Sequence, residues 1–391
     1  MPFVVHLFFN MASLYIHIPF CKQKCIYCDF LSGTNHSLMS AYVDALIKEM
    51  DRYPDFFNDD PIHTIYFGGG TPSLLPLNLL EKLFVAIRNH WNIDDVIEVT
   101  LECNPENITP SFLEQLKQMP INRLSIGVQS LIDNELKWLG RCHNAETAFN
   151  AIRLAQRSGF DNISCDLIFA LPVQTISSVF YSLKQLISLN IQHISVYSLM
   201  FEEGSKITKL MQKGDLLPLD ENISAEMYAV VTNVLKNNGF VHYEISNYAR
   251  PGFRSKHNSG YWNGVRYLGL GASAHSFNGN TRFYNIPHTI KYINAINNEQ
   301  PVATVEILTD AEKFNDFVFT ALRTSDGIDL NELSLRFGPE KYNYILSIAQ
   351  KYIEAGNISI TFSAGNPSRL KLTDAGVYIS DYIISDFMLV E

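Results

Sequence analysis

Three cysteines lie close together near the start of the chain, in the stretch CKQKCIYCDF. Cys21, Cys25 and Cys28 are separated by three and two residues, and no fourth cysteine follows nearby. Structural zinc usually takes four ligands arranged as two pairs, which this spacing does not supply. Thiolates also hold iron–sulfur clusters, and three of them would leave one iron of a [4Fe–4S] cluster open. The spacing favours such a cluster; zinc, or Cys103 as a fourth ligand, is the less favoured alternative.

The open iron of such a cluster has a chemical use. It can take the amine and carboxylate of S-adenosylmethionine (SAM), and the cluster can then donate an electron into the sulfonium and break a C–S bond. The C-x3-C-x2-C spacing is similar to the signature of the radical SAM superfamily. The sequence therefore predicts a [4Fe–4S] cluster and SAM as cofactors.

The cysteines follow directly on the first of six predicted strands, which alternate with amphipathic helical patterns. One such pattern is 145–160, where Gly159 falls just past the helix, as a left-handed cap would. The alternation indicates right-handed β-α-β units, an α/β class and a parallel, curled sheet. Loops after the strands of such sheets carry chemistry. The predicted strands are 14–18, 64–67, 97–101, 123–128, 163–169 and 194–199.

The later part of the chain has a different pattern. Residues 250–290 are rich in Gly, Asn, Ser and aromatics, and we expect a long irregular region there, of the kind that is usually functional. Helical patterns after about residue 300 precede a β-hairpin, which suggests a small winged-helix-like α+β domain. The predicted organisation is an N-terminal extension before the natural start at Met11 (1–12), a core barrel (13–245), an aromatic, Gly-rich region and linker (246–300) and the C-terminal domain (301–391).

Composition narrows the classes of function. The 391 residues are 47% apolar and 18% charged, which suits an ordinary globular chain. Thirty basic against 40 acidic residues give a net charge of -10, so no nucleic-acid partner is expected. The six cysteines form no disulfide framework. The first ten residues lack the features of a signal peptide and are too short to span a bilayer, so we expect a cytoplasmic protein.

Several motifs together resemble one family. YIHIPFCKQKCIYCDF, IYFGGGTPSLL, GVQS, DLIFALPVQT, HNSGYW and YLGLGASAHSF are similar to the oxygen-independent coproporphyrinogen III oxidase family, and more closely to the haem chaperones within it. The resemblance extends from about residue 13 into the C-terminal domain. It implies a partial (β/α)6 TIM-like barrel of radical SAM type, with the cluster at the carboxyl ends of the strands.

The resemblance also implies which residues bind SAM. They belong to the cysteine loop, the GGGTP turn and the ends of the strands: Tyr15, Tyr27, Gly69, Gly70, Thr71, Glu102, Gln129, Arg141 and Asp166. Asp166 lies in an apolar run, where a charge needs a partner. Arg141 is either that partner or a bidentate ligand of the SAM carboxylate. The tyrosines are equally consistent with core aromatics, and the glycines with a tight turn.

Two departures separate the chain from the oxidases of this family. Phe30 stands where the oxidases carry one more cysteine, and the segment before the cysteine loop is shorter. In contrast, HNSGYW matches the HNxxYW motif of the haem chaperones. Because neutral imidazole is a good iron ligand, we predict His257 as the ligand of the haem iron, with His275 as a weaker candidate. The alternative is that this loop covers the barrel mouth and His257 bonds to backbone.

The expected function is that of a haem chaperone, which binds haem and passes it to an acceptor protein. Membrane-associated respiratory proteins are candidate acceptors, and a homodimer is an open option. The cofactors would be the [4Fe–4S] cluster, exchangeable SAM and haem. The alternative is an enzyme, either an oxygen-independent coproporphyrinogen III oxidase or another radical SAM enzyme. A zinc-bound structural module ranks lower.

Overall fold

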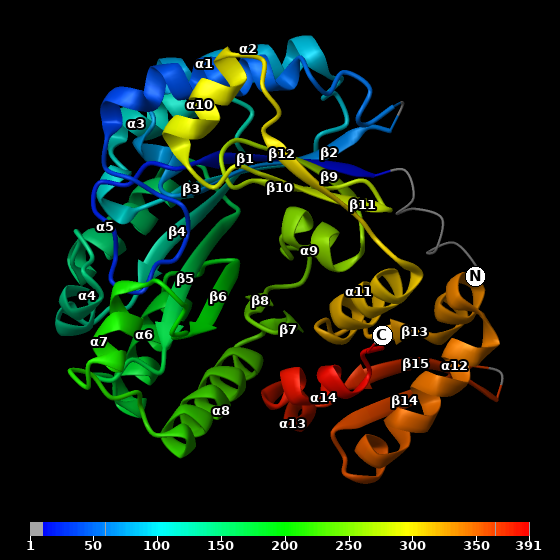
Figure 1. The fold of residues 1–391 in the computed structure, drawn as a ribbon. Helices are drawn as coiled ribbons and strands as arrows, with labels where there is room; N and C mark the ends of the chain where they lie inside the picture. Colours follow the sequence, from blue (N-terminus) through cyan, green and yellow to red (C-terminus); the bar gives the residue numbers. More distant parts are fainter. Residues whose placement is uncertain (1–10, 59, 364, 391) are drawn as a thin grey trace.

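A half-open barrel forms the larger part of the protein in the computed structural model, which describes residues 11–58, 60–363 and 365–390. Six parallel strands lie side by side in chain order, and helices cover their outer face (Figure 1). This arrangement confirms the predicted α/β class. The elements are β1 (Ala12–Ile18), α1 (Met39–Met50), β2 (Ile62–Gly69), α2 (Leu77–His90), β3 (Glu98–Cys103), α3 (Pro110–Leu116), β4 (Arg123–Gln129), α4 (Asp133–Leu139), α5 (Ala145–Arg157), β5 (Ile163–Phe169), α6 (Ile176–Ser188), β6 (His193–Ser198), α7 (Lys206–Gln212) and α8 (Glu221–Asn237).

Side chains of the six strands alternate between an apolar outer layer and a polar interior, as the period of two in a strand requires. In β1, Leu14, Ile16 and Ile18 are fully buried in the core beneath the helices. The alternate residues are polar and meet one another inside the barrel. Examples are the hydrogen bonds from Thr64 Oγ1 to Ser13 Oγ and between Ser164 Oγ and His193 Nδ1. The barrel interior is therefore built for polar chemistry.

Helix ends are set by local sequence. The side chain of Asn144 accepts a hydrogen bond from Thr147 N and caps α5, and Gly159 follows the helix with φ of 87°. Gly239 takes a φ of 83° after α8 in the same way. A left-handed residue turns the chain back toward the sheet, and glycine adopts it without strain. The predicted cap at Gly159 is confirmed.

The prediction of a long irregular region over 250–290 is wrong. The segment from 241 to 307 contains β7 (Val241–Glu244), β8 (Asn247–Ala249), α9 (Lys256–Trp262), β9 (Arg266–Leu270), β10 (His275–Phe277), β11 (Thr281–Asn285), α10 (Thr289–Asn297) and β12 (Ala303–Ile307). Strand β9 pairs in parallel with β1 and is followed by β10, β11 and β12, while β8 and β7 extend the opposite edge beyond β6, so the described residues form a twelve-stranded sheet. Its glycines permit close packing: a Cβ on Gly269 would lie 2.0 Å from His275 O, and one on Gly271 2.4 Å from Tyr42 Oη.

The C-terminal region forms a second, separate core. Its elements are α11 (Asp310–Leu322), β13 (Ile328–Asp329), α12 (Leu330–Glu354), β14 (Ile358–Ser363), β15 (Asn366–Leu372), α13 (Asp374–Tyr378) and α14 (Ser380–Asp386). Buried Phe314, Leu333 and Phe387 belong to this core and not to the barrel core. The predicted order of elements in this region, helices followed by a β-hairpin, is confirmed. Gly338, with non-helical backbone angles, and Pro339 interrupt α12.

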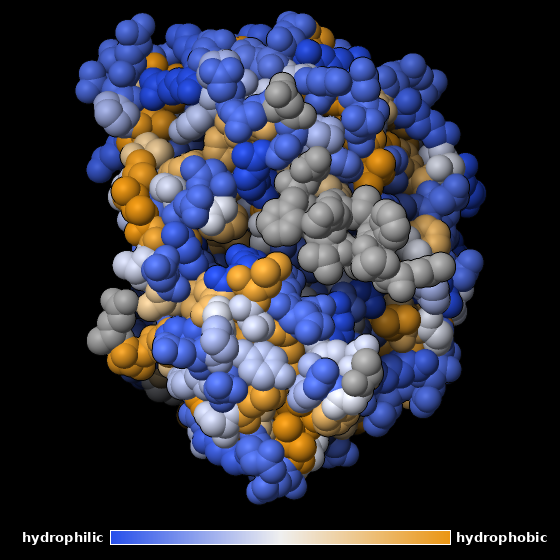
Figure 2. All heavy atoms as spheres, turned by 90° about the vertical axis from the view of Figure 1, so that its right-hand side faces the viewer, coloured by the Kyte–Doolittle hydropathy of each residue, from blue (hydrophilic) through white to orange (hydrophobic). Residues whose placement is uncertain are grey.

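The C-terminal region contacts the barrel along a seam beside β7, α8 and α9 (Figure 1). The face that lies on the right-hand side of Figure 1 carries hydrophobic side chains in separate patches among hydrophilic ones (Figure 2). Within the ranges that the structure describes, no helix has both the length and the apolar character that crossing a lipid bilayer requires.

Candidate functional site

The cysteine loop runs from the end of β1 and is closed on itself by backbone hydrogen bonds. Cys21 N donates to Gly33 O at 2.9 Å, and Gly33 N donates to Pro19 O at 2.9 Å. Two side chains, one after β2 and one between α4 and α5, donate hydrogen bonds to the sulfur atoms. Thr71 Oγ1 lies 3.6 Å from Cys21 Sγ, and Arg141 Nη1 lies 3.5 Å from Cys25 Sγ. Donors of this kind suit thiolates, which are acceptors.

The environment of the sulfur atoms fits a bound cluster. Burial raises the pKa of Cys21 and raises that of Cys28 to about 11, so deprotonated thiols here need bound positive charge. In the described part of the chain, no three His, Cys, Asp or Glu side chains gather closely enough to hold a single metal ion. A cluster makes a different demand, because each of its irons takes its own thiolate. When bound, a [4Fe–4S] cluster supplies one-electron chemistry.

The GGGTP turn packs the end of β2 against the end of β1. Gly69 has a φ of 110°, and a Cβ there would lie 2.5 Å from the ring of His17. A Cβ on Gly70 would lie 2.7 Å from Phe20 O. The amides of Gly70 and Thr71 donate to backbone carbonyls of the β1 end at 2.9 and 2.8 Å. Because Gly69 and Gly70 have no side chains, this turn can pack closely against the start of the cysteine loop.

Glu102, at the end of β3, is a buried carboxyl that faces the barrel interior. It accepts hydrogen bonds from Tyr66 Oη at 2.7 Å and from Gly69 N at 3.1 Å. Burial raises its pKa to about 7, against the effect of these donors. A carboxyl with a pKa of about 7 can hold or release a proton beside a bound cofactor at neutral pH.

Arg141 connects the cysteine loop to two strand ends. Besides Cys25, its guanidinium donates to Asn104 Oδ1 at 2.5 Å and to Gly127 O at 2.8 Å. It makes no hydrogen bond to Asp166, one of the two roles that the sequence suggested. Burial raises the pKa of Asp166, and the Ser195 hydroxyl is the strongest of the opposing effects. Asp166 thus lies in the polar interior of the barrel.

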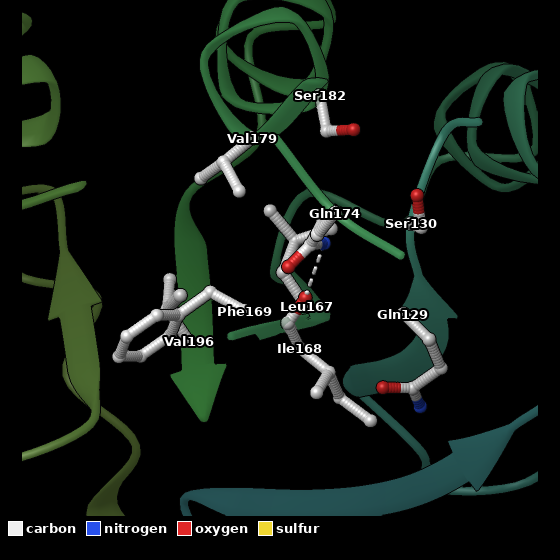
Figure 3. Close-up of a pocket in the computed structure, with 9 residues that line it drawn as sticks. All are labelled: Gln129, Ser130, Leu167, Ile168, Phe169, Gln174, Val179, Ser182 and Val196. Carbon is white, nitrogen blue, oxygen red and sulfur yellow. Dashed lines mark hydrogen bonds between the residues drawn. The ribbon is translucent and has the colours of Figure 1, made fainter. Parts of the chain in front are cut away.

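Of the nine predicted SAM binders, Tyr15 and Glu102 line the large cavity described below, and the other seven, Gln129 and Tyr27 among them, do not. Gln129, with a φ of 66°, borders a small cavity of about 10 Å³ at the ends of β4 and β5, next to Gln174 (Figure 3). This space holds about one water molecule at most. Tyr27 packs instead against a small apolar cluster that contains Leu139 and Ile207. His275, the weaker haem-ligand candidate, is an exposed residue of β10.

A large cavity of about 800 Å³ opens between the barrel interior and the C-terminal region. Its volume is within the ~300–1,000 Å³ typical of ligand and cofactor sites. One end is bordered by Tyr15 and Glu102, and the other by Arg323 and Asp381. Aromatic side chains form much of the wall between the two ends: Tyr66, Tyr197, Tyr228, Tyr261, Trp262 and Tyr378. The cavity can take a flat, largely apolar ligand with polar groups at its rim.

His257 lies in the wall of this cavity, in helix α9 and not in a loop. The carboxylate of Glu98 caps that helix by accepting hydrogen bonds from Lys256 N at 2.9 Å and His257 N at 3.0 Å. The imidazole is 1% exposed, and burial lowers its pKa to about 3, so it is neutral. Its ring nitrogens contact Thr64 Oγ1 at 2.8 Å and Tyr261 Oη at 2.8 Å.

The hydrogen bonds of His257 determine its tautomer. Thr64 Oγ1 donates its proton to Ser13 Oγ, so it accepts from Nδ1–H of His257. Nε2 then carries the lone pair and accepts from the Tyr261 hydroxyl. The alternative that His257 bonds to backbone through its ring is not what the structure shows. Histidines that bind metals commonly donate their other N–H to a fixed acceptor, which is the arrangement here.

Sequence reasoning missed several residues of the barrel interior. Arg123 is 1% exposed with Nε and Nη1 unpaired in the protein, and its charge helps to lower the pKa of His257. Glu98 and Tyr66 hold α9 and Glu102 in place. A signal was present: polar residues stand at every second position of otherwise apolar strands, as in RLSIGV and IEVTLE. That stripe marks a polar interior.

Comparisons with known proteins agree with this geometry. The family model of the radical SAM superfamily matches residues 15–186. The solved structure of coproporphyrinogen III oxidase (HemN) from Escherichia coli has the same fold, with a TM-score of 0.83, 21% identity and coverage of 97% of this chain and 90% of that one. The fold and the cysteine loop therefore define a radical SAM protein, a class that implies a [4Fe–4S] cluster and SAM.

Two curated relatives identify the family within that class. Heme chaperone HemW from Bacillus subtilis is 35% identical over 382 residues, which cover 97% of this chain and 99% of the relative. Heme chaperone HemW from Lactococcus lactis is 31% identical over 378 residues, which cover 96% and 97%. The chain belongs to the HemW family. The predicted resemblance to haem chaperones is confirmed.

Proposed function

We propose that the protein is a haem chaperone, which binds haem in the large cavity and passes it to an acceptor protein. One observation carries the proposal. A neutral histidine in the wall of an aromatic-lined cavity is anchored through Nδ1 on Thr64, and its Nε2 carries a lone pair that the hydroxyl of Tyr261, another wall residue, occupies. Neutral imidazole is a common axial ligand of haem iron. The HemW names of the relatives support the same cargo.

The iron would compete with Tyr261 for the lone pair of His257. A hydrogen bond in the protein interior has a net worth of about 0.5–1.5 kcal/mol, which a metal–ligand bond can replace. Helix α9 would keep the imidazole in place during this exchange, because Glu98 and Thr64 hold its other contacts. We further propose that acceptors include membrane-associated respiratory proteins and that two copies of the chain associate during transfer.

The cluster would lie in the cysteine loop, outside the residues that line the cavity, and SAM would lie between this loop and the end of the cavity bordered by Tyr15 and Glu102. Cys21, Cys25 and Cys28 would hold the cluster, with Thr71 and Arg141 donating to the first two sulfur atoms. Tyr15 and Glu102 border the cavity at this end and would contact SAM, together with the Gly69–Thr71 turn beside them. Gln129 and Asp166 do not line the cavity and would support the SAM region from outside it, at the end of β4 and in β5.

Haem titration of the wild-type protein and a His257→Ala variant tests the proposal. We expect stoichiometric binding to the wild type with a Soret band of a histidine-ligated haem. The variant should show a shifted band and at least a tenfold loss of affinity. A His275→Ala variant is the matched control and should behave like the wild type. Unchanged spectra and affinity in His257→Ala would rule out the ligand role.

The alternative function, oxidation of coproporphyrinogen III, is tested with the same preparation. Phe30 stands where the oxidases of the wider family carry a further cysteine, and it is 61% exposed. Anaerobic incubation of cluster-loaded protein with coproporphyrinogen III, SAM and a reductant should yield no protoporphyrinogen. Formation of that product would favour the enzyme over the chaperone.

A further inference from the structure

Polar atoms without a partner in the protein gather at the C-terminal end of the cavity. They are Glu244 Oε1, Asn247 Oδ1 and Arg323 Nε, and all three residues line the cavity. Glu244 and Asn247 are each 5% exposed. Glu244 Oε1 and Asn247 Oδ1 are acceptors and Arg323 Nε–H is a donor, so of the three unpaired atoms the Arg323 one is suited to an anionic ligand group.

The backbone holds Arg323 firmly at this place. Ile245 N donates to Arg323 O at 3.2 Å, and Ser325 N donates to Tyr243 O at 2.9 Å, so the end of α11 pairs with the edge of β7. The guanidinium lies against the Trp262 ring, with its carbon 5.8 Å from the ring centroid. Such packing fixes the plane of the guanidinium and directs its N–H groups.

Charge identifies what this end of the cavity can bind. Among the described residues that line it, Arg323 is the one with a permanent positive charge. Its Nη1 donates to Asp381 Oδ1 at 2.7 Å, but the Asp381 side chain is 83% exposed and that ion pair is therefore weak. The other N–H groups of the guanidinium remain available for an anion, and carboxylates match their fork geometry.

The spacing along α9 relates this arginine to the proposed iron ligand. His257 and Trp262 are five residues apart, an axial distance of about 7.5 Å in a helix. His257, Trp262 and Arg323 all line the same cavity, so a macrocycle whose iron meets His257 would lie in the space that the guanidinium on Trp262 also borders.

We propose that Arg323 binds a carboxylate side chain of the porphyrin cargo, so that the C-terminal region contacts the cargo directly; this inference rests on the haem binding proposed above. The carboxylate takes the free N–H groups of the guanidinium in a bidentate pair. Burial raises the pKa of Glu244, so this neighbour takes up a proton more readily than an exposed carboxyl as the anion enters.

The test compares two ligands, haem and haem dimethyl ester, whose carboxylates are blocked. The wild-type protein should bind haem about 10- to 100-fold more tightly than the ester, since hydrogen bonds to a charged group contribute about 1.5–3 kcal/mol. Arg323→Met should lose that preference by weakening haem binding alone. Arg323→Lys keeps the charge without the fork and should retain part of the preference.

Arg254→Met is the matched control. Arg254 forms an ion pair with Asp326 at the same seam but does not line the cavity. This variant should keep the full preference for haem, which separates carboxylate binding from a general loosening of the seam. Equal affinity of the wild type for haem and its ester would overturn the proposal and leave haem binding itself intact. No binding of either ligand would overturn the proposed function as well. The comparison of haem with its ester on the wild-type protein tests carboxylate binding even if Arg323→Met fails to fold.

Discussion

The two ends of the cavity differ in how far the protein satisfies its own polar groups. At the barrel end, Glu102 lines the cavity and accepts two hydrogen bonds; Arg141, behind the lining, donates three and keeps one unpaired atom, Nε. At the C-terminal end, Glu244 and Arg323 keep unpaired buried atoms. The first end is thus largely preorganised within one barrel, whereas the second is completed by what enters the cavity.

This difference suggests separate tasks for the two ends. Groups already held in place give a cofactor a fixed position, because their geometry need not change on binding. Groups that lack a partner gain one only when the cargo is present, so they favour a ligand that comes and goes. A chaperone needs both, since its own cofactors stay while its cargo leaves.

The largest effect should come from removing a cluster ligand. We expect Cys28→Ser to lose the iron–sulfur chromophore after anaerobic reconstitution, because a cluster with two remaining thiolates is poorly held. Iron and sulfide analysis together with the visible spectrum provides the measurement. The variant should still bind haem, as the cavity end with Arg323 does not involve the cysteine loop.

Cys142→Ser is the matched control for that variant. Cys142 is exposed and lies beside the cysteine loop, with Sγ 3.8 Å from Gln23 Oε1. It should keep wild-type iron and sulfide contents. If Cys28→Ser held a full cluster, or if Cys142→Ser lost it, the assignment of the three ligands would be wrong.

Much of the cysteine-loop end could be predicted from the sequence. Cys21, Cys25 and Cys28 are close in the chain, so their spacing alone limits the chemistry, and strand ends of parallel units converge on one edge of a sheet. Glu102 follows directly from its place at the end of a strand. His257 was found through a short motif, although its helix was not.

The C-terminal end could not be predicted in the same way. Glu244, Trp262 and Arg323 are far apart in the chain, and only the pairing of the α11 end with β7 brings them together. No local pattern encodes that contact. The strands of 266–285 were missed for a related reason: their glycines resemble loop residues in sequence but serve close packing in the fold.

A medium effect should appear in the pH dependence of stability. The pKa of Glu102 rises from its ordinary value of 4.5 to about 7 on folding, so the folded state holds a proton that the unfolded state has lost. Stability therefore falls as pH rises through this window and is level above it. Glu102→Gln removes the titration, and its stability relative to the wild type should increase by on the order of 3 kcal/mol between pH 4.5 and 8.

Two further carboxyls sharpen this test when thermal unfolding is followed at several pH values. Burial also raises the pKa of Glu244, so Glu244→Gln should change relative stability in the same direction. For Glu106, burial is the largest effect and raises the pKa, but the neighbouring His143, the backbone and the Arg141 charge together outweigh it, so the pKa is lowered. Glu106→Gln should therefore be less stable than the wild type near neutral pH. This difference in stability should disappear only as the pH falls below the ordinary pKa range of carboxyls. If the stability of the wild type and that of Glu102→Gln changed with pH in parallel, the raised pKa of Glu102 would be wrong.

The smallest effect is expected at the surface of the seam. Lys236 of α8 pairs with Asp374 of α13 at 2.5 Å, and the two side chains are 36% and 71% exposed. Exposed ion pairs contribute about 0–1 kcal/mol, whereas the backbone pairing of β7 with the end of α11 is shielded by the fold. Lys236→Met should thus lower the melting temperature by no more than about 2 °C and leave the preference for haem over its ester unchanged. A large loss of either would mean that surface charge, and not the β7 contact, positions Arg323 against the cavity.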